Sequence, residues 1–491
     1  MNRPARTVLV TLVVAATAAV WAAGCAPRPI DVPFPAYQPT AASPTGDFKG
    51  AAVGMSGCLA TGCHGGSVAK ALEGSPDEFA WMSSGSVWVA ADPHSAAYSL
   101  LTENPHRTPK VTAADIMRNY APDKKAHEDA RCLACHTNPA LAEPGPTADP
   151  HVLGLRNEGV SCEACHGNAG GWLGSHTSWK GKRDDAGYKA AGMTVLDDIG
   201  ERAMNCLGCH VGAPADKERG LPVRDMNHDM IAAGHPRLNF DFAEYLRRLP
   251  PHWQEKDRTG SAPVAHGLNS AKAWLVGRAA HAEAACKLLA SRADRSATDP
   301  KTPWPEFAEF NCASCHHNLR VGTKDDPNWR QNAVNLDGRP PGATPWQMIW
   351  PMTPAAGLPG PTRADAALNS LLVAIEKPRL VSAATAKAAV VALGDLEARR
   401  KAFAGLPDAE AVRQVRGWLH PDGKGPDVNV SEWDSATQLY FGMAALERTY
   451  GANRDAVPPA FGKAWDAFRA KDWGDSSKWL GDIRTIQQQR P

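Results

Sequence analysis

Five short segments of the chain place a histidine directly after the second of two closely spaced cysteines. The third is Cys162-Glu163-Ala164-Cys165-His166, and three others share its two-residue spacer. The first, from Cys58 to His64, has four residues between its cysteines. Cys-x-x-Cys-His is the attachment sequence of c-type haem, in which both thiols bond to the ring and the histidine binds the iron. The sequence therefore predicts five covalent haems, and the fold must be built around them.

The residues assigned to these haems follow from the motifs. The cysteines expected to carry the rings are Cys58, Cys63, Cys132, Cys135, Cys162, Cys165, Cys206, Cys209, Cys312 and Cys315. The histidines expected to bind the irons on the near side are His64, His136, His166, His210 and His316. Zinc sites also use paired cysteines, but they do not require a histidine directly after every second cysteine. Disulfides suit an exported chain, yet they do not explain the histidines either.

Each iron has a second axial position, which another histidine can fill. Asp92 and Pro93 form a capped helix start that gives His94 a fixed direction, so His94 is the first choice. The candidates for this far-side position are His94, His176, His235, His228, His281 and His317. His281 could equally be a buried core histidine, and His317 could instead hydrogen-bond a haem propionate. A filled position favours electron transfer, whereas an open one allows ligand binding and chemistry.

The N-terminus has the pattern of an export signal. Two arginines precede an apolar run that ends at Gly24-Cys25, which predicts a signal peptide over 1–25. The ending is similar to a lipoprotein cleavage site, with Cys25 as the lipidation candidate; a plain cleaved signal is the alternative. Residues 26–50 are rich in proline and alanine and are expected to form an extended tether. The expected location is the periplasm, the outer membrane or the cell surface. A net charge of +1 gives no case for nucleic-acid binding.

The rest of the chain predicts a mainly α fold with much irregular loop. The multihaem domain spans 51–320, a Pro/Gly/Trp-rich segment that wraps it spans 321–362, and a C-terminal α-helical region spans 363–491. In the haem domain, a long helix is expected over 268–292, with Trp274, His281, Ala285 and Leu288 on one face. Asn239 is expected to cap a short helix that ends before Pro250. Amphipathic helices are expected over 363–377, 382–404, 408–419, 431–450 and 458–471.

The order of motifs over about residues 50–210 resembles the cytochrome c-554 family of multihaem cytochromes. The most specific part is the block Gly-Val-x-Cys-x-x-Cys-His-Gly over 159–167, which is followed by His176. The resemblance implies closely stacked haems in a mostly irregular, helix-containing fold. It also implies that His94 and His176 bind the irons of haems other than their sequence neighbours. The chain departs from the family in its longer first spacer, its fifth motif and its C-terminal region, so the family's electron donor does not carry over.

The function expected from the sequence is electron transfer by an exported multihaem c-type cytochrome in a respiratory or nitrogen-cycle chain. Its partners would be redox donor and acceptor proteins, together with a membrane reached through lipid at Cys25. The alternative is a multihaem oxidoreductase that acts on a small nitrogen or sulfur compound at one open iron. Multihaem nitrite reductases typically carry lysine in place of one proximal histidine, and no Cys-x-x-Cys-Lys occurs here.

Overall fold

The computed structural model describes residues 51–66, 80–102, 111–142, 149–177, 185–238, 240–250, 269–300, 302–304, 306–309, 382–419 and 433–450. The signal segment with Cys25, the tether, the 321–362 segment and the helices expected over 363–377 and 458–471 lie outside these residues. So do the fifth motif, with Cys312, Cys315 and His316, and the neighbouring His317.

The described part of the chain is mainly α-helical, as the sequence predicts, and its β-structure consists of isolated bridges such as Ala213 with Arg224. The α-helices are α3 Ser84–Ala91, α4 Ala113–Tyr120, α5 Ala130–His136, α6 Pro150–Asn157, α7 Cys162–His166, α8 Leu173–His176, α9 Asp185–Ala190, α10 Ile199–His210, α11 His228–Ala232, α12 Phe242–Arg248, α13 Ser270–Thr298, α16 Ser382–Gly405, α17 Asp408–Leu419 and α18 Trp433–Tyr450. The 3-10 helices are η1 Met55–Gly57, η2 Ala80–Ser83, η3 Pro93–Ala96, η4 Tyr98–Leu100, η5 Ala126–Glu128, η6 Pro139–Leu141, η7 Ala169–Gly171 and η8 Phe307–Glu309.

Short helices dominate residues 51–250, and polar caps explain where many of them begin. The side chains of Asp92, Asp129, Asp149 and Asp198 each accept a backbone N–H at the start of η3, α5, α6 and α10. Such caps satisfy donors that a helix start otherwise leaves unpaired. The cap of α12 is Asp241, which accepts from the backbone N–H of Glu244, so the prediction that Asn239 caps this helix was wrong.

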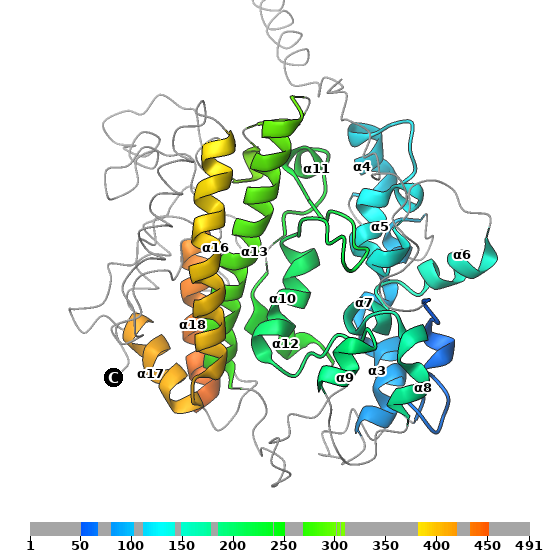
Figure 1. Cartoon of the computed structure of the whole chain (residues 1–491), viewed down its shortest axis with the longest axis horizontal. Coiled ribbons are helices and arrows are strands. Elements are labelled where there is room, and N and C mark those ends of the chain that lie inside the picture. The colour runs from blue at the N-terminus through cyan, green and yellow to red at the C-terminus, as the bar shows by residue number, and fades with distance from the viewer. Residues whose placement is uncertain are drawn as a thin grey trace, which may run out of the picture.

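The long helix α13 is the centre of the described C-terminal half. Figure 1 shows it beside α16, with α18 next to them and the short helices α3, α5, α7 and α8 on the far side of α10 and α12. One apolar core joins α10, α12, α13, α16, α17 and α18, and it includes Leu207, Phe242, Trp274, Phe403 and Met443. The helices at 382–405 and 408–419 therefore form as predicted and pack directly on α13.

The helix α13 is buried on more than the one face that the sequence identified. Trp274, His281, Ala285 and Leu288 are buried, but so are Val276 and Glu283 on other faces. Neighbouring helices surround α13, and Arg400 of α16 pairs with the buried Glu283 at 2.7 Å. The helix also ends later than expected, at Thr298. Among the described helices, none combines the length and apolar character needed to cross a membrane.

Candidate haem-binding site

Three of the four described motifs put their histidine at the end of a helix. His136 ends α5, His166 ends α7 and His210 ends α10, so each follows its cysteines around the last helical turn. The first motif differs because its longer spacer forms a turn instead, with the N–H of Cys63 donated to the carbonyl of Ala60. Each of these motifs therefore presents two thiols and an imidazole from one compact piece of backbone.

Three motif histidines lie opposite candidate far-side histidines. The ring centres of His64 and His176 are 6.3 Å apart. Those of His94 and His210 are 6.1 Å apart, and those of His136 and His235 are 6.4 Å apart. A metal held between two imidazoles at about 2.0–2.1 Å per bond would separate the ring centres by roughly 6.3 Å. The spacing of each pair therefore fits one iron bound from both sides.

Hydrogen bonds fix the orientation of these rings. The Nδ1 atoms of His136 and His235 lie 2.9 and 2.8 Å from the carbonyl oxygens of Ala97 and Pro236. His176 makes the same kind of contact with the carbonyl of Leu173. A carbonyl can only accept, so Nδ1 carries the proton and Nε2 keeps the lone pair that a metal needs. His64 is held by the hydroxyl of Ser84 at 3.0 Å.

The protonation of the buried rings also suits metal binding. Burial lowers the pKa of His136, and burial followed by the charge of His94 lowers the pKa of His210 to about 4. Burial alone would lower the pKa of His94, but the hydrogen bond and charge of Asp92 outweigh it and raise that pKa. Neutral imidazole is the form that binds metal, so His136 and His210 are ready to ligate at neutral pH.

The Gly159-Val160 pair before the third motif holds His94 in place. Gly159 has φ +70°, and a Cβ there would lie 2.6 Å from the carbonyl oxygen of His94. The same carbonyl accepts the N–H of Val160 at 3.1 Å, and the Val160 carbonyl accepts the indole N–H of Trp88. Only glycine fits this positive φ and close approach without strain. This explains why the block at 159–167 and the distant His94 form one unit.

Glu163, inside the third motif, ties the first motif to the third. Its carboxylate is buried and accepts the N–H groups of Val53 at 2.9 Å, Gly54 at 2.8 Å and Ala169 at 2.6 Å. Glu158 adds a bond from the N–H of Met55. Sequence reasoning missed Glu163 because it treated the two residues between the cysteines as spacer. The sequence did contain a signal, because Glu163 is a charged residue in a segment that a haem ring is expected to cover.

Thiols of different motifs lie next to one another. The Cys58 thiol of the first motif lies beside the Cys162 thiol of the third, and the Cys135 thiol of the second lies beside the Cys209 thiol of the fourth. The nine cysteines in the described ranges are all free thiols, Cys286 of α13 among them, so no disulfide links the motifs there. Burial raises the pKa of Cys206 to about 12. Cys165 of the third motif also lies near Cys206 and Cys209 of the fourth, so the first, third, fourth and second motifs follow one another as neighbours.

The remaining candidates lie elsewhere. His281 is buried in α13, where burial and then Arg278 hold its pKa well below the usual range. Its Nε2 has no hydrogen-bond partner among the described residues. His228 begins α11; its backbone N–H is donated to Glu306, and its ring packs against Phe307 at 5.7 Å.

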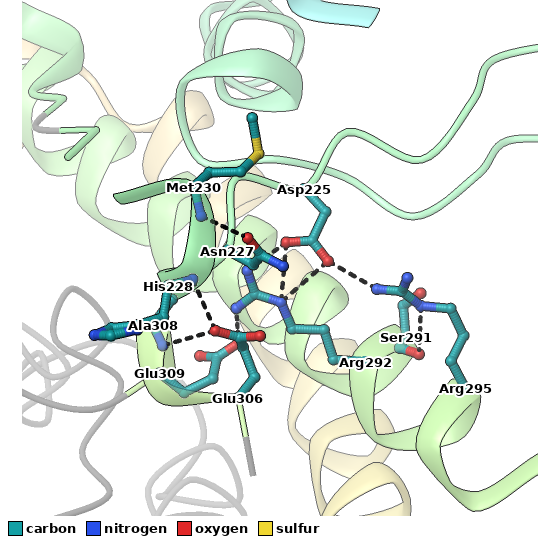
Figure 2. A network of polar contacts seen from close by, with 10 residues as sticks. All are labelled: Asp225, Asn227, His228, Met230, Ser291, Arg292, Arg295, Glu306, Ala308 and Glu309. Atoms are coloured by element: carbon teal, nitrogen blue, oxygen red, sulfur yellow. Dashed lines mark hydrogen bonds and ion pairs between the residues drawn. The ribbon is translucent and has the colours of Figure 1, made fainter. Parts of the chain in front are cut away.

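An ion-pair network joins the His228 segment to the chain just before the fifth motif (Figure 2). Arg292 of α13 is buried and pairs with Asp225 at 2.5 Å and with Glu309. Arg295 adds a second contact to Asp225 at 2.8 Å. The network therefore fixes His228 beside residues 306–309, three residues before Cys312.

Within the described ranges, no three histidine, cysteine or acidic side chains converge to hold a metal ion by themselves. The described residues instead provide pairs of imidazoles beside pairs of thiols, and a haem protein uses these ligands. A family model described as cytochrome c554 and c-prime matches residues 84–167. That stretch contains His94 and the second and third motifs. The match supports a c-type cytochrome. Proteins of this class hold haem, with its iron, through covalent bonds from the ring to the chain. Neither curated proteins nor solved structures gave a match.

Proposed function

We propose that this protein is an exported pentahaem c-type cytochrome whose function is to carry electrons between redox partner proteins. The observation that carries the proposal is the set of three histidine pairs, each of which joins a motif histidine to a histidine from a distant part of the chain. Each pair has the spacing that one iron requires, and the members of each pair come from different supersecondary units.

The ligand set favours electron transfer over catalysis. In each pair, one imidazole comes from a Cys-x-x-Cys-His or Cys-x4-Cys-His motif, and the other closes the opposite side. His176 serves the first motif, His235 the second and His94 the fourth. An iron bound by two imidazoles has no open position for a substrate, and the haem supplies the one-electron chemistry. The protein then contributes ligands, spacing and electrostatics.

The contacts between thiols support close spacing of the haems. Rings attached at adjoining thiols cannot be held far apart, because each thioether fixes one edge of its ring to that cysteine. The Cys58–Cys162 and Cys135–Cys209 contacts would therefore place the first haem beside the third and the second beside the fourth, and Cys165 near Cys206 and Cys209 would place the third beside the fourth. Such spacing lets an electron pass from iron to iron through the chain of haems.

The fifth haem, the export signal and the lipid anchor extend the proposal to parts of the chain outside the described residues. Cys312, Cys315 and His316 would hold the fifth haem, with His317, His228 or His281 as its far-side ligand. Cys25 would attach the protein to a membrane through lipid, and the proline-rich tether would hold the haem domain away from that membrane.

A haem count on the full chain tests the proposal. The protein should be produced with the export and haem-attachment machinery and assayed as its pyridine haemochrome. The expected result is five haems per chain, and Cys162→Ala combined with Cys165→Ala should remove one. A chain without covalent haem contradicts the proposal. In carbon monoxide titrations of the reduced protein, the three paired irons should not bind the gas. Rapid binding of one equivalent of gas per chain would favour the oxidoreductase alternative, which needs one open iron.

A further inference from the structure

His94 differs from the other paired histidines in the group that holds its Nδ1 atom. Asp92 Oδ1 lies 2.9 Å from Nδ1 of His94 and also 2.9 Å from the backbone N–H of the same residue. The Asp92 side chain is 3% exposed, so water screens this contact poorly. The carboxylate thus caps η3 and binds the His94 ring with the same oxygen.

The other contacts to Nδ1 that the structure gives for the paired rings are all to neutral groups. Backbone carbonyls hold His136, His176 and His235, and the hydroxyl of Ser84 holds His64. Of the five described Nδ1 contacts, the one at His94 is to a carboxylate. Charge-assisted hydrogen bonds are about twice as strong as neutral ones. A carboxylate partner therefore pulls the Nδ1 proton further and makes Nε2 a stronger electron donor than in the other pairs.

Aromatic neighbours do not account for a difference of this kind. Phe240 stacks on His210 with ring centres 4.7 Å apart, and apolar cover of this sort favours the less charged, reduced iron. Trp172 also contacts a paired ring, meeting His176 edge-on with ring centres 5.4 Å apart. Aromatic contact is thus found in more than one pair, whereas the described Nδ1 contact to a carboxylate belongs to the His94–His210 pair.

We propose that Asp92 is a tuning residue that gives the iron held by His94 and His210 the lowest reduction potential of the three paired irons. The inference rests on the proposed function, since it requires that this pair bind a haem iron. The negative charge of Asp92, passed through the imidazole, stabilises the oxidised iron over the reduced one. This iron is then the last of the three to be reduced, and it suits the end of the haem chain that receives electrons from a strongly reducing donor.

The test is Asp92→Asn in the full haem-loaded chain, followed by spectroelectrochemical titration and low-temperature EPR. Asparagine keeps the capping oxygen, so η3 should still form. The lowest of the three potentials should rise by about 59 mV, which is a tenfold change in the ratio of oxidised to reduced iron. One low-spin EPR signal should shift with it. Asp92→Ser, which also caps, supplies the same readouts if the asparagine variant fails to mature, and Asp92→Glu should recover part of the lower potential.

Asp149→Asn is the matched control, because Asp149-Pro150-His151 repeats the tripeptide at 92–94. Asp149 likewise caps a helix through the N–H of His151, but both residues are exposed. This control should leave every potential unchanged. The inference is overturned if Asp92→Asn leaves the lowest potential where it was, or if Asp149→Asn raises it equally. The proposed function has its own separate readout: wild-type protein without low-spin irons overturns that proposal, whereas normal low-spin irons with an unshifted potential overturn only the role of Asp92.

Discussion

Replacing Glu163 by alanine should loosen the joint between the first and third motifs. The bonds from Gly54 and Ala169 are buried, and the bond from Val53 is partly buried. Leaving a buried backbone N–H without an acceptor costs roughly 1–3 kcal/mol, so the two buried donors together cost about 2–6 kcal/mol. Water can replace the carboxylate at Val53, so that donor adds little. This loss is a large part of the 5–15 kcal/mol that typically separates folded and unfolded states.

Guanidinium chloride unfolding followed by far-UV circular dichroism measures this loss, because it reports helix rather than haem ligation. The midpoint should fall with an unchanged slope if only stability changes. Glu397→Ala is the control, since Glu397 forms an exposed pair with Lys401 on α16 and should change stability by less than about 0.5 kcal/mol. A loss below about 1 kcal/mol for Glu163→Ala would refute the reasoning that this carboxylate holds the segment before the first motif.

Three further changes have defined outcomes. His176→Ala should convert one iron to a high-spin form in EPR. The control His151→Ala, which changes an exposed histidine, should leave the spectrum unchanged. An all-low-spin spectrum for His176→Ala would contradict the His64–His176 pairing. Arg292→Ala should cost about 3–5 kcal/mol in chemical unfolding, because it leaves Asp225 and Glu309 buried, and the half-exposed Arg295→Ala should cost clearly less. Burial raises the pKa of Asp241 from 3.8 to about 6, although the backbone N–H of Glu244 and the charges of Arg278 and Arg448 oppose the rise. Between pH 4 and 6 the folded state therefore holds a proton that the unfolded chain releases, so the contribution of Asp241 to the free energy of unfolding falls as the pH rises through this range. In Asp241→Asn this pH-dependent loss, about 3 kcal/mol over the interval, should be absent.

Local signals allowed the sequence to predict much of the site. Cysteine and histidine spacing located the motifs, and the Asp92-Pro93 start placed His94 at the head of a helical turn, as the structure shows. The boundaries of α16 and α17 also follow from local pattern and agree with the structure within one residue. These features depend on neighbours in the chain, so a single sequence contains the information needed to find them.

Features that depend on distant contacts could not be predicted in the same way. The pairing of His235 with His136 joins residues that are far apart in sequence, and no period or spacing encodes it. The helix α13 is buried on several faces because helices from both earlier and later parts of the sequence pack against it. The cap of α12 is a different case, because Asp241 and Glu244 have the local Asp-x-x-Glu spacing of a helix start, and the sequence-based choice of Asn239 passed over that signal.

The most direct test of the account is a quantitative low-temperature EPR measurement on the oxidised, haem-loaded protein. The central claim is that His64 with His176, His94 with His210 and His136 with His235 each bind one iron from both sides. The account predicts at least three low-spin irons per chain with the signals of paired imidazole ligands. Fewer than three such irons, with the remainder high-spin, would contradict it.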